Sequence, residues 1–530
     1  MNKIIRTSIP LIVAAFAVTP ILVIFSSALQ PREDLWTHLL QTSLPTLALN
    51  TLFLCLGVAI GTGVLGVLLG WIIATCDFPG RRFFSTALLL PMAIPTYVFA
   101  FVFLGLFDFS SPLQLLLRDW FGIAPFDVRS IWTVCITMTL ALYPYVYVMA
   151  KSGFTTQGQR CLEAARTLGR SYFSAFYSVG IPLCRPWIAI GILLVLMETL
   201  ADFGAVSVFN FDTFTTAVYK AWYGFFSLST ASQLASILVL LALILLNGEQ
   251  RLRKKMRFTQ ERSSFQRIPL NGIKAIAACC FCTAIFFIGF IIPVVQLAWW
   301  SLGNFTIELS AQYLTFSANT LTLGLVAAGI TCLAALSLAY AARFQKTKFT
   351  QVVISLSTIG YSLPGTVLAV GIIAPIAYFD NAYIQISTWI IGQPVPPLLQ
   401  GTILALLIAY AIRFLAAAYG SINSSMQRIT PSMDEASALM GITGWKMLSK
   451  VHLPQLKTGL FTAALLVLVD VMKEMPITLM TRPFGWDTLA VKIYELTSEG
   501  EWERAAIPSV LLILVGLIPV LYINKKTDCA

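Results

Sequence analysis

Four acidic residues form two pairs with helical spacing inside otherwise apolar sequence. Glu198 and Asp202 are four residues apart, and so are Asp470 and Glu474. Residues four apart lie on one face of a helix, so each pair presents two carboxylates together. Hard oxygen ligands suit a highly charged cation, and unpaired acids are costly among apolar residues. The pairs are therefore candidates for transient contacts with a highly charged metal cation, above all at Asp202 and Glu474, or for a structural or gating role in which hydrogen bonds and Lys473 satisfy them.

Few other side chains offer covalent or acid–base chemistry. His38 and His452 are the only histidines, and no nucleophile is clustered with a base. None of the ten cysteines forms a Cys-x-x-Cys motif or pairs with a nearby histidine, so neither a zinc site nor a disulfide framework is predicted. No glycine is followed by lysine, so the phosphate-binding loop that ends in Gly-Lys-Ser/Thr is missing from the sequence. We expect no catalysis by this chain alone and no cofactor bound to it.

A second pattern occurs twice, with identical internal spacing. Glu-Ala-Ala or Glu-Ala-Ser is followed by a glycine six residues after the glutamate and by a proline thirteen residues after the glycine. The copies contain Glu163, Ala164, Ala165, Gly169 and Pro182, and Glu435, Ala436, Ser437, Gly441 and Pro454. A short helix can precede each glycine, the glycine permits a left-handed turn, and the proline suits the first turn of the next helix.

The residue types in these loops favour contact with a soluble partner. Small alanines permit close approach to a groove, and glutamates offer charge-assisted hydrogen bonds. An alternative for Glu435 is a capping box with Ser432, three residues earlier. Residue 160 is an arginine, so a capping box does not explain Glu163. We therefore predict that both loops dock a partner.

Membrane-spanning helices must position these residues. Of the 530 residues, 58% are hydrophobic and only 11% are charged, against about 25% charged in soluble domains. Continuous apolar runs of about 20 residues predict transmembrane helices, and the alternation typical of a β-barrel is absent from the sequence. Twelve runs lie near residues 9–29, 48–76, 84–107, 131–150, 186–208, 231–247, 275–301, 319–342, 350–379, 399–422, 458–481 and 505–523.

The distribution of basic residues predicts the orientation. The formal net charge is +11. If the N-terminus is cytoplasmic, 26 of the 35 basic residues fall on the cytoplasmic side, seven fall outside and two lie within spans. Short basic loops are rarely translocated, so both termini are predicted to be cytoplasmic. The positive charge then reflects topology and the lipid bilayer, and no nucleic acid partner is predicted.

The chain is predicted to be an internal duplication. The triplet Asn50-Thr51-Leu52 recurs as Asn319-Thr320-Leu321, and Pro95 recurs as Pro364 at the same interval. An even number of spans in each half makes the two copies parallel, related by a pseudo-twofold axis along the membrane normal. The predicted parts are a first half (1–248) with a loop at about 155–185, a basic cytoplasmic linker (249–274), and a second half (275–530) with a loop at about 427–457.

The repeated loop resembles the signature of importer permeases of the ATP-binding-cassette superfamily. The whole chain resembles the fused, two-half permeases of bacterial ferric-iron importers. Four stretches carry this narrower resemblance, namely Glu198–Val206, Phe211–Tyr219, Asp470–Pro476 and Arg482–Ala490.

The resemblance implies an all-α membrane protein of twelve transmembrane helices in two parallel repeats. It implies that Glu163, Ala164, Ala165 and Gly169 belong to one coupling helix, and Glu435, Ala436 and Gly441 to another. Each would contact one of two cytoplasmic ATPase subunits, which would hold ATP and Mg. A periplasmic or surface solute-binding protein would deliver ferric iron to this subunit in the bacterial inner membrane. Fused thiamine and phosphonate permeases share the architecture, and a secondary transporter driven by an ion gradient is a further alternative.

Overall fold

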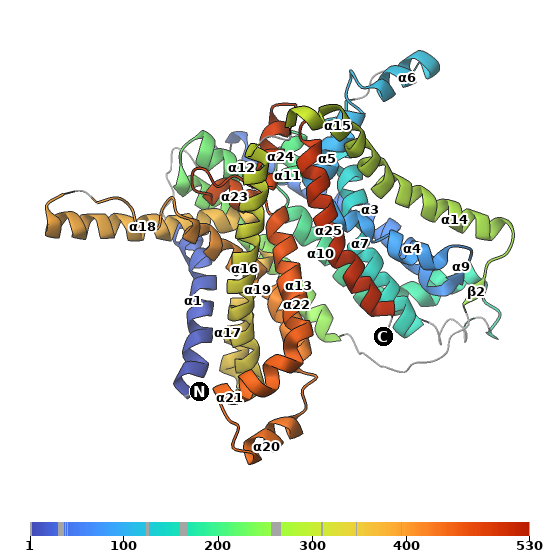
Figure 1. Ribbon diagram of the computed structural model, residues 1–530. Helices are drawn as coiled ribbons and strands as arrows, with labels where there is room; N and C mark the ends of the chain where they lie inside the picture. The colour runs from blue at the N-terminus through green and yellow to red at the C-terminus, as the bar shows by residue number, and fades with distance from the viewer. Residues whose placement is uncertain are drawn as a thin grey trace. The chain divides into compact units, whose positions relative to one another are not determined.

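The computed structural model describes most of the chain (Figure 1). The described residues are 3–29, 37, 39, 41–122, 127–158, 165, 167–255, 267–308, 311–345, 347–393 and 395–528. Within them the regular structure is almost entirely helical. The strands found there, β1 (Cys76–Asp77) and β2 (Ile268–Pro269), form one short parallel pair. The prediction of an all-α protein is confirmed.

Ten of the described helices are long and apolar enough to cross a membrane. An eleventh is counted if the helices Arg81–Ala93 and Thr96–Leu106, which are bent by 91°, form one span. The last predicted run corresponds to a shorter apolar helix, Ala506–Leu521. The chain is therefore a polytopic helical membrane protein, and the predicted count of twelve is approximate.

The chain divides into two compact units. Unit 1 comprises Met1–Leu40, Phe214–Val239 and Leu309–Lys492. Its helices are α1 (Lys3–Ala28), α12 (Phe214–Tyr219), α16 (Ala311–Phe344), α17 (Lys348–Ser357), α18 (Gly365–Ile391), α19 (Ile403–Met426), α20 (Pro431–Leu439), α21 (Trp445–Met447), α22 (Leu453–Lys473) and α23 (Pro476–Thr481). Helices α13 (Leu228–Lys255) and α24 (Leu489–Ser498) begin in unit 1 and end in unit 2.

Three long helices, α16, α19 and α22, pack against one another in unit 1. Helix α1 packs against α16, α17 and α18 (Figure 1). Its buried face carries apolar residues such as Ala17 and Ile24, spaced by whole helical turns. Gly371 permits this approach, because a Cβ atom there would lie 2.8 Å from the Cβ atom of Pro20. The first helix of the chain therefore packs on helices of the second sequence half.

Unit 2 comprises Gln41–Thr213, Leu240–Glu308 and Ile493–Ala530. Its helices are α3 (Leu44–Thr75), α4 (Arg81–Ala87), α5 (Thr96–Leu106), α6 (Pro112–Phe121), α7 (Ile131–Gly153), α9 (Tyr172–Ala175), α10 (Ile181–Ala201), α11 (Gly204–Val208), α14 (Ile273–Phe286), α15 (Ile292–Glu308) and α25 (Ala506–Asp528). Helices α3, α7 and α10 pack against one another. Glycines in α3 make the α3–α7 crossing close, because a Cβ atom at Gly66 would lie 2.7 Å from the Cβ atom of Val146.

Equivalent helices of the two halves follow the intervals predicted from the sequence. The first residues of α10 and α22 are as far apart in the sequence as Glu163 and Glu435, and so are their last residues. Helices α5 and α18 begin at the interval that separates Pro95 from Pro364. Together with the matching triplets α3–α7–α10 and α16–α19–α22, this agreement supports the duplication. The compact units nevertheless differ from the sequence halves, because α1 belongs to unit 1 and α14 and α15 belong to unit 2.

Two predicted runs are broken before a proline. Ile94 and Leu363 have extended backbone conformations, and Pro95 and Pro364 then begin α5 and α18 as their N-cap residues. A residue before proline avoids the helical conformation, because it would clash with the proline ring. The runs 84–107 and 350–379 are therefore not continuous helices.

Candidate functional site

The second loop of the repeated pattern forms helix α20. Thr430 is its N-cap residue and Pro431 occupies its first turn, where proline is well tolerated. Ser432 therefore lies inside the helix and does not cap it, so the capping box proposed as an alternative for Glu435 is not formed. Glu435 and Ala436 are exposed.

Both loops end in the left-handed turn that their glycines permit. Gly441 has a φ angle of 75° and Gly169 a φ angle of 82°. After α20, the Ile442 N–H donates to the Ser437 carbonyl oxygen at 2.9 Å, and the Gly441 N–H donates to the Ala438 carbonyl oxygen at 3.0 Å. This is the Schellman arrangement of helix ends.

The first loop has an equivalent bond. The Arg170 N–H donates to the Ala165 carbonyl oxygen at 3.1 Å, and these two residues are the counterparts of Ile442 and Ser437 in the duplication. Glu163 and Ala164 lie outside the described residues. The two loops thus end in the same local structure.

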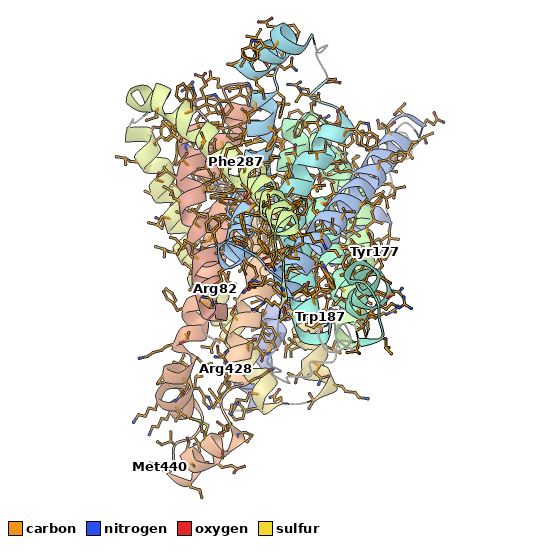
Figure 2. The ribbon with its side chains drawn as sticks, turned by 90° about the vertical axis from the view of Figure 1, so that its right-hand side faces the viewer. Arg82, Tyr177, Trp187, Phe287, Arg428 and Met440 are labelled. Carbon is orange, nitrogen blue, oxygen red and sulfur yellow. The ribbon has the colours of Figure 1, made fainter. Side chains whose placement is uncertain are left out.

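Each loop exposes an apolar side chain directly before its glycine. Leu168 is 84% exposed, and Met440, at the equivalent position, is 76% exposed. Figure 2 shows Met440 at the end of the loop, farther out than Arg428. Leu439 and Trp445 add exposed apolar surface to the second loop. Exposed apolar side chains on a projecting helix are typical of a docking surface.

An ion-pair network holds the second loop. Asp434 accepts a hydrogen bond from Nε of Arg343 at 2.9 Å and contacts Nε2 of His452 at 2.8 Å. Arg343 also donates to the carbonyl oxygens of Met426 and Ile429, both at 3.0 Å. His452 is fully buried. The network fixes α20 to the end of α16 and to the segment that leads into α22.

The sequence alone did not predict this network, although two of its residues lie beside features that the sequence does predict. Asp434 directly precedes Glu435, and Arg343 lies in the last turn of a predicted span. The first half contains Ala74 and Gly180 at the positions equivalent to Arg343 and His452, so it has no such charges. There, Trp71 packs against Phe154 and Phe176, with ring centroids 5.2 and 4.7 Å away.

Asp202 lies where the fifth predicted span is broken. It is the C-cap residue of α10, and its carboxylate accepts hydrogen bonds from the backbone N–H groups of Ala205, at 2.9 Å, and Val206, at 3.3 Å. Its other oxygen accepts a hydrogen bond from the Thr96 hydroxyl at 2.5 Å. The carboxylate thereby satisfies two backbone N–H groups in the first turn of α11, whose N-cap residue is Phe203.

Glu474 occupies the equivalent break in unit 1. It is the C-cap residue of α22, and Pro476 begins α23 two residues later. Nε of Arg413 lies 3.1 Å from one carboxylate oxygen of Glu474, and the Ile477 N–H lies 3.4 Å from the other. The Glu474 and Arg413 side chains are only 8% and 13% exposed. Sequence reasoning missed this pairing, although an arginine inside an apolar span signals a buried partner.

The first member of each acidic pair lies within a helix. Glu198 in α10 and Asp470 in α22 are half-buried, and Asp470 interacts electrostatically with Lys473 and Arg413. Asp202 and Glu474 are the C-cap residues of these helices, so each acidic pair lies at the end of a helix and not in the middle of a continuous span. Among the described residues, no group of three or more histidine, cysteine, aspartate or glutamate side chains is arranged to hold a metal ion.

Comparison with known proteins places these features in a family. Residues 66–251 and 335–525 each match the family described as the binding-protein-dependent transport system inner membrane component. The Fe(3+)-transport system permease protein FbpB 2 of Haemophilus influenzae is 25% identical over 483 residues, which cover 90% of this chain and 89% of that protein.

Two further relatives match shorter segments. The molybdenum transport system permease protein ModB of Escherichia coli is 29% identical over 186 residues, or 34% of this chain and 80% of that protein. The sulfate transport system permease protein CysT of Escherichia coli is 30% identical over 151 residues, or 28% of this chain and 52% of that protein.

Each half of the chain therefore contains one copy of the permease domain. This membership excludes the alternative of a secondary transporter, and the relatives named above are permease subunits rather than enzymes. The chain belongs to the family of inner membrane components of binding-protein-dependent transport systems, the permease subunits of ATP-binding-cassette importers.

Proposed function

We propose that this chain forms the membrane pathway of an ATP-driven importer of ferric iron. The observation that supports ferric iron as the substrate is the match to the Fe(3+)-transport permease, which extends over nine-tenths of this chain and most of the relative. The molybdenum and sulfate permeases match only about a third of the chain. Carriage of an oxyanion such as molybdate is the second candidate, supported by those shorter matches.

The two loops would connect the permease to two copies of a cytoplasmic ATPase, which would bind ATP and Mg. Both loops end in the same hydrogen-bonded glycine turn, and an apolar side chain, Leu168 or Met440, is exposed directly before the glycine. These features support this role. Glu163 and Glu435 would add charged contacts. The Asp434 network makes α20 stiff with respect to α16 and α22, so that a movement of the ATPase would be transmitted to the spans.

The outward-facing loops would receive the ion from a solute-binding protein. The chain would lie in the bacterial inner membrane with both termini in the cytoplasm, because 26 of its 35 basic residues then face inward. Alternating access would follow when ATP-driven closure of the ATPase favours one packing of the spans over another.

Uptake by the reconstituted complex tests the proposal. The permease, its ATPase and its binding protein are incorporated into liposomes, and ATP-dependent uptake of ferric iron, molybdate, sulfate, thiamine and a phosphonate is compared. Uptake of ferric iron that requires ATP and the binding protein is expected. Uptake of another solute in preference to ferric iron would overturn the substrate, and uptake without the ATPase would overturn the mechanism.

A further inference from the structure

One polar contact in each unit joins the breaks of two different spans. In unit 2 the Thr96 hydroxyl, on the first residue after the Ile94–Pro95 break, donates to Asp202 at the end of α10. In unit 1 the Arg413 guanidinium donates to the Leu363 carbonyl oxygen at 2.7 Å and pairs with Glu474 at the end of α22.

These contacts lie at equivalent places of the duplication but use different side chains. The residue equivalent to Thr96 is Gly365, and the residue equivalent to Arg413 is Ala141. Gly365 makes room for the second contact, because a Cβ atom there would lie 2.6 Å from Oε1 of Glu474. The junction between breaks is therefore built twice around an equivalent carboxylate, with a hydroxyl donor in unit 2 and a guanidinium donor in unit 1.

Burial makes the Arg413–Glu474 junction of unit 1 an all-or-none contact. A break inside a span leaves backbone groups without helical partners, and these need other partners where water is scarce. Arg413 satisfies the Leu363 carbonyl, and Asp202 satisfies two N–H groups of α11. Separating Arg413 from Glu474 would break an ion pair between two largely buried side chains, so intermediate separations are unfavourable.

We propose that these junctions are latches. Each stabilises the resting packing of the helices in its unit until ATP-driven closure of the ATPase changes that packing. Thr96 and Arg413 are the positioning residues, and Asp202 and Glu474 are the groups that they hold. This inference rests on the transport function proposed above and assigns Glu474 to Arg413 in place of the ferric ion. Both carboxylate oxygens of Glu474 already have donors, which supports the assignment.

ATP hydrolysis by the complete complex in liposomes, measured without binding protein, tests the latches. The substitutions Arg413→Gln and Gly365→Ala should raise this basal rate at least about fivefold, the lower end of usual coupling effects. Thr96→Val should also raise the basal rate, and Thr96→Ser, which keeps the hydroxyl, should leave it at the parent's value. The matched control is Gly420→Ala in α19, where a Cβ atom would meet nothing within 4 Å.

An unchanged basal rate in assembled Gly365→Ala and Thr96→Val complexes would overturn the proposal. These variants remove no charge, so they carry the test even if Arg413→Gln does not fold. The double variant Asp202→Asn with Glu474→Gln is a second test. If it loses ferric uptake while its basal rate of ATP hydrolysis is unchanged, direct contact of these carboxylates with the ion is favoured and the latch is also overturned. Basal hydrolysis needs no substrate, so an error in the proposed substrate leaves this test intact.

Discussion

Replacing Arg413 by glutamine should lower the free energy of unfolding by about 3–5 kcal/mol, because it leaves the Glu474 carboxylate buried without its cation. Only 8% of the Glu474 side chain is exposed, so water cannot replace the guanidinium. The same substitution removes the hydrogen bond to the Leu363 carbonyl oxygen, and leaving that buried acceptor unpaired costs about 1–3 kcal/mol. Glu474→Gln alone should also destabilise the chain, because Arg413 loses its ion-pair partner and keeps only its electrostatic interaction with Asp470.

The double variant Arg413→Gln with Glu474→Gln distinguishes a paired charge from general damage. It should be more stable than the sum of the two single effects predicts, because no buried charge is left alone. Denaturant titration of the purified chain in micelles, followed by tryptophan fluorescence, measures the four free energies. Additive losses, or an Arg413→Gln variant as stable as the parent, would refute the reasoning.

Three further predictions concern the loops and the topology. Charge reversal by Glu163→Lys and Glu435→Lys together should weaken ATPase binding in pull-down assays and leave binding-protein capture unchanged; normal transport would contradict the docking role. Gly441→Val should destabilise the turn by at least about 1–2 kcal/mol, because valine disfavours a positive φ angle, and should reduce coupled uptake. In a cysteine-free background, Asp127→Cys should react with an impermeant thiol reagent from outside and Arg257→Cys should not; the reverse pattern would invert the orientation.

Local rules account for the features that could be predicted from the order of residues. Apolar runs predicted the helices because a bilayer satisfies backbone groups only within helices or barrels. The constant interval between Glu163 and Glu435 and between Gly169 and Gly441 predicted the paired loops, and glycine's freedom at positive φ predicted their turns. The breaks at Pro95 and Pro364 follow from proline chemistry as well, although hydropathy alone predicted continuous runs.

Which distant residues meet depends instead on how the helices pack. The partner of Glu474 is Arg413, on a different helix, and Asp434 joins Arg343 to His452. The local sequence indicates that these charged groups need partners but not which partners they meet, because each pair depends on how α16, α19 and α22 pack. The same holds for α1, which joins the helices of the second half in unit 1. Its apolar face would suit many neighbours, and the hydrophobic effect does not specify a partner; shape does, through close approaches such as that of Gly371 to Pro20.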